Sequence, residues 1–343
     1  MQGLFPIWTV AFALMMGASI GSFLNVVIYR MPLGLKLGEP KHSFCPNCNH
    51  QLHVPDLVPL FSWLFLGGKC RHCRVPIPPR YFIVELITGS LWAIIWYQNL
   101  IVGWNLLQAV ALFLMVSTLV AATFIDLRWF IIPDQLNAFL LAVGLVVNGI
   151  QIGMGLPGAW LWGMPASIAG ALVGTFSIWF VTLVGRLLFG KDAMGHGDIK
   201  LMRGIGAILL PVGVGLTFAI AVVLGAVLGI VQVLISRKLK SGQEEAETED
   251  NEPYIPESIA SIFKCGLGYF LAFDCIGLAI PKFYESWFGE NPYSNEDFDP
   301  SWTPEPTAIP FGPYLAVGAI LAALANAPLM QIVNRYWAYL NGS

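Results

Sequence analysis

Long apolar runs constrain the fold of this chain more than any other feature. Runs of about 18 residues or more, enough to cross a bilayer as a helix, are residues 5–29, 81–100, 103–125, 135–155, 165–188 and 309–332. A further run, 204–236, is too long for one untilted crossing. Because 56% of the residues are hydrophobic and only 11% are charged, a soluble core cannot bury them. The sequence therefore predicts an all-α polytopic membrane protein.

The basic residues predict the orientation of these helices, because short connections rich in Lys and Arg stay in the cytosol. Segment 30–80 is strongly basic and segment 186–203 is basic too, whereas the turns near 101–104 and 156–164 carry no charge. We expect the N-terminus outside and 30–80 in the cytosol. The basic residues at 237–240 are cytosolic as well if 199–236 forms a hairpin, or a short half-helix followed by a full span. That gives about eight transmembrane helices.

The first apolar run lacks a preceding basic stretch and a convincing small-residue cleavage site. We therefore expect that it is not a cleaved signal peptide.

Four cysteines stand in the predicted cytosolic insert as two C-x2-C pairs, Cys45 with Cys48 and Cys70 with Cys73. This spacing is close to that of a zinc ribbon, in which two knuckles complete a closed tetrahedral site of the structural kind. Disulfides are disfavoured in the reducing cytosol. We expect structural zinc, with a redox dithiol as the alternative. A soluble insert of this size needs such a staple to fold.

A carboxylate occurs at the end of an apolar run in each of two places. Asp198 follows Gly195 and Gly197 in the stretch Gly-His-Gly-Asp, and Asp126 ends the run that begins at Leu106. Charges at membrane depth indicate function, and two close carboxylates can share a proton, so that one acts as base and the other as acid. Such a pair can activate a water molecule against a peptide bond.

Each aspartate also has a structural explanation. Asp198 can cap the helix that begins at Ile199, and Asp126 can be a membrane-edge residue offset by Arg128. Asp134 is a rival for the catalytic role, but it follows a proline and precedes an apolar run. We interpret Asp134 as a helix N-cap.

The motifs together resemble the type 4 prepilin peptidase and N-methyltransferase family, whose members are aspartyl proteases of the GxGD type. The matching stretches are Gly21 to Pro32, the two cysteine pairs, Pro76-Ile77 with Arg80-Tyr81, Val84 to Leu86, Asp126 with Ile132 to Asp134, Gly195 to Lys200, and Ile309 to Pro313. They occur in the family's order over nearly the whole chain.

The resemblance implies that Asp126 and Asp198 form the catalytic pair, supported by Gly195, Gly197 and Lys200. It implies cleavage of the basic leader of type IV prepilins or type II secretion pseudopilins at the cytosolic face of the bacterial inner membrane. It also implies methylation of the new N-terminal residue from S-adenosylmethionine. The partners expected are these precursors and the lipid bilayer, with no nucleic acid.

The resemblance also suggests how the chain is divided. Residues 1–104 form a methylation region that holds the insert, 105–236 a peptidase region, and 307–343 a final membrane helix. Residues 237–306 form a cytosolic insertion that the family's usual pattern lacks. It contains an acidic stretch, expected to be a solvated linker, and an apolar stretch from Ile262 to Phe283, expected to be interfacial or re-entrant.

Two polar residues at the cytosolic ends of spans have more than one explanation. Glu85 and Asn25 can contact the leader or the methyl donor, or they can make hydrogen bonds between helices. The sequence does not locate the methyl-donor site.

Other functions remain as alternatives. An intramembrane aspartyl protease without methylation would lack a use for the cysteine insert. A proton-coupled transporter would show repeat-like halves, and a membrane thiol oxidoreductase would place its cysteines on the oxidising face.

Overall fold

The computed structural model describes residues 5–39, 42–45, 47–103, 105–190, 194–240, 258–289, 291–293 and 310–325, with the backbone alone for 232–240. The chain divides into two compact units. The first comprises residues 1–125 and 294–300, and the second comprises 126–293 and 301–343.

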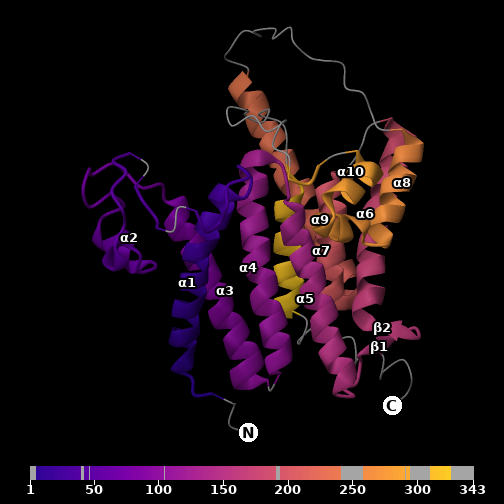
Figure 1. The fold of residues 1–343 in the computed structure, drawn as a ribbon, viewed down its shortest axis with the longest axis horizontal. Coiled ribbons are helices and arrows are strands. Elements are labelled where there is room, and N and C mark those ends of the chain that lie inside the picture. Colours follow the sequence, from indigo (N-terminus) through magenta and orange to yellow (C-terminus); the bar gives the residue numbers. More distant parts are fainter. Residues whose placement is uncertain are drawn as a thin grey trace. The chain divides into compact units, whose positions relative to one another are not determined.

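The first unit is built on a close pair of antiparallel helices, α1 (Thr9–Arg30) and α3 (Arg80–Trp96), as Figure 1 shows. A π-helical turn, η2 (Tyr97–Val102), extends α3, and most of α4 (Leu106–Trp129) follows. Gly17 and Gly21 lie one turn apart on α1, and a Cβ on Gly21 would come within 2.7 Å of the Cα of Glu85. Small residues therefore let the two backbones approach, as in other membrane helix pairs.

The segment between α1 and α3 forms the small insert. It contains a 3₁₀ turn, η1 (Val54–Asp56), and one short helix, α2 (Phe61–Phe65). Isolated β-bridges join Phe44 to Gln51 and Lys69 to Pro76. The insert is attached to α3 in part through Trp63, whose ring stacks on Phe82 with centroids 5.1 Å apart.

The second unit begins with α5 (Asp134–Gly153) and α6 (Ala166–Phe189), joined by a small antiparallel hairpin. Strands β1 (Trp160–Leu161) and β2 (Met164–Pro165) pair Trp160 with Pro165 and Leu161 with Met164. Both turn residues, Trp162 and Gly163, have positive φ, which is typical of a two-residue hairpin turn.

Helix α7 (His196–Lys240) is two helices joined by a sharp reversal. Leu210 has φ 61° and ψ 176°, and Pro211 follows it. A Cβ on Gly206 would lie 2.9 Å from Cγ2 of Val214. Residues eight apart in one helix are separated by about 12 Å along its axis, so the two segments must fold back on each other. A reversal of the chain therefore lies within 199–236, as both arrangements expected there require.

Three short helices follow: α8 (Ile259–Phe270), α9 (Phe273–Ala279) and α10 (Pro281–Phe288). Helices α8 and α9 are bent by 73° at their break, so the pair is a broken span or a re-entrant loop. Trp179 of α6 donates a hydrogen bond to the carbonyl of Ile262 at 3.1 Å. The helix Gly312–Ala325 comes last among the described residues. The acidic stretch, 244–252, lies outside them.

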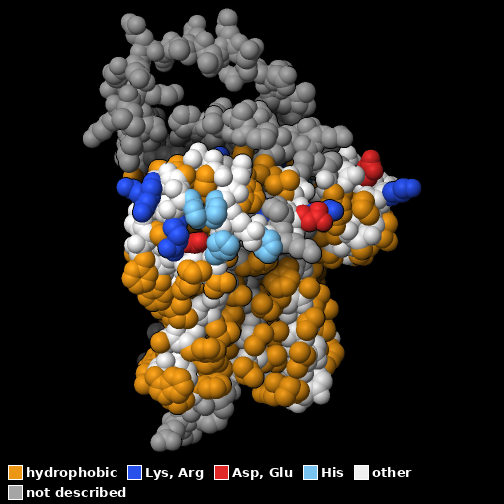
Figure 2. Space-filling model, turned by 60° about the vertical axis from the view of Figure 1, so that its left-hand side comes forward, with side chains coloured by type: hydrophobic (Ala, Val, Ile, Leu, Met, Phe, Trp, Pro, Cys, Tyr) orange, Lys and Arg blue, Asp and Glu red, His pale blue; other side chains and the backbone are white. Residues whose placement is uncertain are grey.

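The helices fit a membrane protein. Five of those described are long and apolar enough to cross a bilayer, namely α1, α4, α5, α6 and the His196–Val231 part of α7, and the bent pair would make six. Figure 2 shows hydrophobic side chains over much of the visible helical surface. The prediction of an all-α polytopic protein is confirmed. The count of eight helices stays a prediction.

Candidate active site and metal centre

Asp126 lies in the last turn of α4 and is buried, with 5% of its surface exposed. The backbone N–H of Gly312 donates a hydrogen bond to its carboxylate. A Cβ on Gly312 would collide with Oδ2 of Asp126. A glycine is therefore needed where the start of the last described helix meets this aspartate.

Asp198 lies in the first turn of α7 and is 8% exposed. Its backbone N–H donates to the carbonyl of Gly195 at 3.1 Å, and the N–H of Gly195 donates to its carboxylate. Helix α7 begins at His196, so Asp198 is a residue of the helix and does not cap a helix that starts at Ile199.

The two aspartates belong to one site. Asp126 contacts Gly312, Asp198 follows Gly197 directly, and both glycines lie against Ile132. Ile132 bridges the surrounding backbone, because a Cβ on Gly197 would lie 3.2 Å from its Cβ and one on Gly312 would lie 2.9 Å from its Cδ1. The end of α4, the link to α5, the start of α7 and the start of the last described helix thus converge.

This arrangement suits acid–base chemistry. Two carboxylates in a buried site can hold one proton between them, and each has a backbone donor that fixes its orientation. A water molecule between them would meet a base on one side and an acid on the other. The structure places Asp126 and Asp198 beside glycines that contact the same Ile132, and their pairing and catalytic role stay predictions.

Asp134 is not the helix N-cap expected from the sequence. Pro133 occupies the cap position, and Asp134 is the first residue of α5. Its carboxylate accepts hydrogen bonds from Nζ of Lys200 at 2.7 and 2.8 Å and from the hydroxyl of Tyr284 at 2.5 Å. The N-cap interpretation is wrong because a buried lysine binds this carboxylate instead. Lys200 therefore binds Asp134, and its supporting role at the aspartate site stays a prediction.

Glu85 and Asn25 both make contacts that hold the first unit together. Glu85 accepts the backbone N–H of Leu60 at 2.7 Å, which joins the insert to α3. Leu60 has a positive φ of 65°, a conformation that this hydrogen bond helps to hold. Asn25 of α1 donates to the carbonyl of Tyr81 at 3.1 Å, so it makes the hydrogen bond between helices that was one of its two explanations.

The insert gathers its four cysteines into one cluster. The sulfur atoms of Cys45, Cys48, Cys70 and Cys73 all lie within 4.8 Å of one another, and all four thiols are free. Cys45 Sγ and Cys73 Sγ are 3.8 Å apart. Two thiolates at about 2.3 Å from a tetrahedral zinc ion would be separated by about 3.8 Å. The cluster therefore fits zinc.

Both cysteine knuckles have the same local geometry. The residue after each pair, Asn49 or Arg74, has a positive φ and donates its N–H to the carbonyl of the first cysteine of its own pair. The N–H of Val75 and the side chain of Asn47 lower the pKa of Cys73 to about 6. A thiol with this pKa supplies the thiolate that a metal requires.

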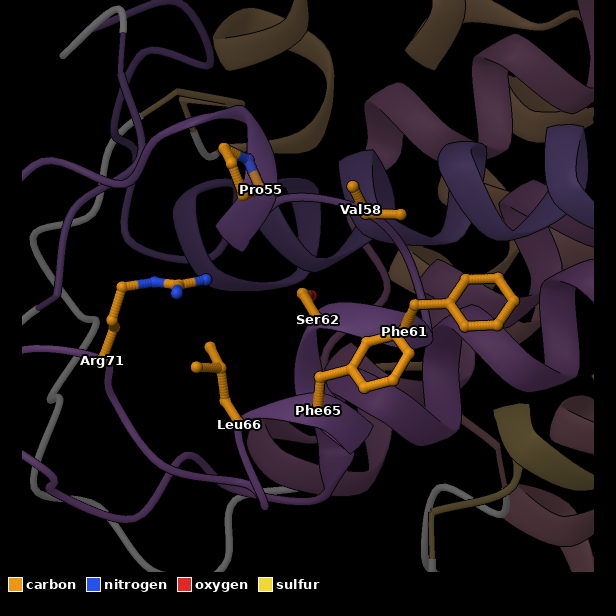
Figure 3. Close-up of a pocket in the computed structure, with 7 residues that line it drawn as sticks. All are labelled: Pro55, Val58, Phe61, Ser62, Phe65, Leu66 and Arg71. Atoms are coloured by element: carbon orange, nitrogen blue, oxygen red, sulfur yellow. The ribbon is translucent and has the colours of Figure 1, made fainter.

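A cavity of about 270 Å³ lies in the insert beside α2, and Figure 3 shows the side chains around it. It is lined by Pro55, Val58, Phe61, Ser62, Phe65, Leu66 and Arg71. The guanidinium of Arg71 is bound to Asp56 at 2.6 Å. The cavity walls are thus mostly apolar.

Sequence reasoning did not identify several contacts made around Asp126 and along α7. Gly312 had a visible signal, since it precedes a proline at the start of an apolar run. Asp274 had another, because an aspartate inside an apolar stretch requires a partner, and that partner is Arg203. No pattern in the sequence indicates that Tyr284 contacts Lys200.

Comparisons with known proteins agree with this site. The profile of the Bacterial Peptidase A24 N-terminal domain matches residues 15–99, and that of the Type IV leader peptidase family matches 113–230. No solved structure matches.

Curated relatives named prepilin leader peptidase/N-methyltransferase occur in several bacteria. The one from Aeromonas hydrophila is 36% identical over 63% of this chain and 78% of its own length. The one from Stutzerimonas stutzeri is 36% identical over 69% and 85%. The one from Myxococcus xanthus is 32% identical over 96% and 93%, so that alignment runs through residues 237–306.

Proposed function

This chain belongs to the prepilin leader peptidase/N-methyltransferase family, and on that premise we propose that it cleaves the leader from prepilin-like precursors and then methylates the new N-terminus. The observation that carries the proposal is the buried pair of Asp126 and Asp198, each held by a glycine N–H. A peptidase of this type needs two carboxylates and one water molecule.

In the proposed cleavage, the ionised carboxylate takes a proton from water as the oxygen attacks the carbonyl carbon of the scissile bond. The protonated carboxyl gives its proton to the carbonyl oxygen. When the C–N bond breaks, the leaving amine receives a proton from the pair, and the leader keeps the new carboxyl group. Gly312 and Gly195 hold the carboxylates in place during these transfers.

Methyl transfer must follow cleavage, because the amine that accepts the methyl group does not exist in the precursor. S-adenosylmethionine supplies the methyl group. The free amine would accept this methyl group and lose one proton, and the sulfur of the donor would leave as a thioether. We assign this reaction to residues 1–104, which include the cysteine insert, and we assign the insert a structural zinc ion held by the four cysteines.

The basic segment 30–80 and the positions of the two aspartates at helix ends support an active site on the cytosolic face of the bacterial inner membrane. The substrates proposed are type IV prepilins or pseudopilins of type II secretion. The apolar N-terminal helix of such a precursor could lie in the bilayer while its basic leader reaches the aspartates.

The test uses the full-length protein in liposomes with a prepilin precursor and S-adenosylmethionine. Mass spectrometry should show loss of the leader and a mass increase of one methyl group on the product. Asp198→Asn should leave the precursor intact and unmethylated, yet methylate a synthetic peptide that begins at the mature residue. Cleavage without any methylation would favour an aspartyl protease that lacks the second activity. Failure of Asp198→Asn on the pre-cut peptide would place both reactions at one site.

A further inference from the structure

The helices α8, α9 and α10 contact the helix that carries Asp198 along one stripe. Their partners on α7 are His196, Lys200 and Arg203, which are spaced by four and three residues and so share a face. Asp198 lies two residues from His196 and from Lys200 and therefore points elsewhere. The stripe thus lies behind the aspartate.

The deepest of these contacts is a buried ion pair. Arg203 and Asp274 each have 2% of their side-chain surface exposed, and they form two parallel hydrogen bonds of 2.7 and 2.5 Å. Arg203 also donates to the carbonyl of Tyr269 at 2.7 Å. A fork-shaped pair fixes direction as well as distance, so it sets the position of α9 against α7.

Lys200 lies in a cage made by the same segment. Its Nζ binds both oxygens of Asp134 and the hydroxyl of Tyr284, which uses all three of its donors. The rings of Tyr269, Tyr284 and Phe288 surround it, with centroids 5.2, 5.5 and 5.8 Å from Nζ. This is the geometry of a cation–π cage.

The last contact reaches the glycine-rich turn itself. The hydroxyl of Tyr269 lies 2.9 Å from Nδ1 of His196, between Gly195 and Gly197. Further along α7, the helix packs closely on α6 and α5. A Cβ on Gly174 of α6 would meet the backbone of Met202, and one on Gly204 would meet Leu140 of α5. The α8–α10 contacts therefore begin where α7 is flanked by glycines, whose backbone is the least restricted.

We propose that residues 259–288 are a positioning clamp, which fixes the first two turns of α7 and thereby holds Asp198 in place for cleavage. This inference rests on the proposed function, and it makes Tyr269, Asp274 and Tyr284 positioning residues for that reaction. The family profile ends at residue 230, so the clamp lies outside the part of the chain that the profile matches.

The test compares three variants of the full-length protein in liposomes. Asp274→Asn leaves Arg203 unpaired, Tyr284→Phe removes a hydroxyl and keeps the ring, and the double variant Arg203→Met with Asp274→Leu removes both charges so that neither stays unpaired. Lys282→Met and Glu285→Gln are the controls, because both side chains are exposed on α10.

Two measurements apply to each variant. Amide hydrogen exchange at residues 196–201 should rise about tenfold in the three clamp variants, while residues 214–230 keep the parent rate. The kcat of prepilin cleavage should fall about 30-fold for Asp274→Asn, about tenfold for the double variant and about fivefold for Tyr284→Phe, since small misplacements are costly. KM should stay within about twofold if the clamp only positions Asp198. Methylation of a pre-cut peptide and both controls should match the parent.

The clamp is refuted if exchange at 196–201 does not change, or if it rises and cleavage continues at the parent rate. A parallel loss of cleavage, methylation and thermal stability in all three variants also refutes it, since the segment would then serve the fold alone. If the parent cleaves no prepilin while exchange still rises in the variants, the proposed function fails and the mechanical clamp stands.

Discussion

The cysteine cluster and the aspartate site each bring several side chains together, but the residues of the two sites are separated by very different distances along the chain. The cluster draws its four ligands from residues 45–73, and each knuckle is complete within five residues. The aspartate site draws on residues from Asp126 to Gly312, which belong to four separate stretches. Local geometry builds the first site, whereas helix packing brings the parts of the second together.

This difference determines what holds each site together. The knuckles need positive φ at Asn49 and Arg74, and a bound metal would hold the four thiols together. The aspartates need helices that approach closely, which glycines at 144, 170, 174 and 204 allow. Damage to the insert should therefore remain within the insert. A change in the packing of any one of these helices should displace the aspartates.

The largest expected effect comes from the aspartates themselves. Asp126→Asn and Asp198→Asn should each reduce leader cleavage by about 10³-fold or more, because a fixed amide can neither accept nor deliver the proton. Asp134→Asn should reduce cleavage and not abolish it, since Asp134 binds Lys200 and is not one of the two proposed catalytic carboxylates. Quantitative assays of processed prepilin would measure all three. Near-normal turnover by either of the first two variants would remove that residue from the mechanism.

A smaller effect should follow from crowding the same site. Gly312→Ala keeps the N–H that binds Asp126 but adds a Cβ that collides with Oδ2. Cleavage should fall about 100-fold, while a pre-cut peptide is still methylated. Gly149→Ala is the control, because a Cβ there meets nothing within 4 Å. Equal losses in the two glycine variants would mean that helix packing in general, and not this contact, limits the rate.

These two sites also show which structural features could be predicted from the sequence. The C-x2-C spacing predicts the cysteine cluster, because the partners are close in the chain and the turn geometry is local. The apolar runs predict the helices, since α1, α5 and α6 begin and end near the predicted limits. Proximity of Asp126 and Asp198 could be inferred only from their chemistry, because nothing local links them.

The contacts of Asp134, Asp274 and Tyr284 could not be predicted from the sequence. Each depends on how α8–α10 fold against α5 and α7, over separations of 66 to 150 residues. A charged residue in an apolar run signals that a partner exists, and it does not say which residue that partner is. The N-cap interpretation of Asp134 failed for this reason.

The third prediction concerns the metal and the independence of the two sites. Purified protein should contain about one zinc ion per chain, as elemental analysis can determine. Cys70→Ser should lower the zinc content and abolish methylation of the pre-cut peptide, while leader cleavage stays within about tenfold of the parent. If the metal content is unchanged, the four thiols are not its ligands. If cleavage is lost as fully as methylation, the insert does not act separately from the aspartates.

The smallest expected effect lies at the edge of the insert, in the pair of Asp56 and Arg71. Burial raises the pKa of the Asp56 carboxyl, but the hydrogen bond and charge of Arg71 outweigh it and leave the pKa below its usual value. A carboxyl of this kind contributes stability above the pKa of its unfolded form, about 3.9, and loses it as the pH falls through the folded value. Half of the Arg71 side chain is exposed, so the pair should be worth no more than about 1 kcal/mol.

Asp56→Asn should therefore speed amide exchange at residues 53–57 by about threefold at pH 7. Parent and variant should converge toward pH 3, after correction for intrinsic exchange rates. Zinc content and cleavage should not change, because neither the cluster nor the aspartates depend on this ion pair. A persistent difference at low pH would show that the hydrogen bond from His53 to Asp56, and not the charge of Arg71, stabilises this turn.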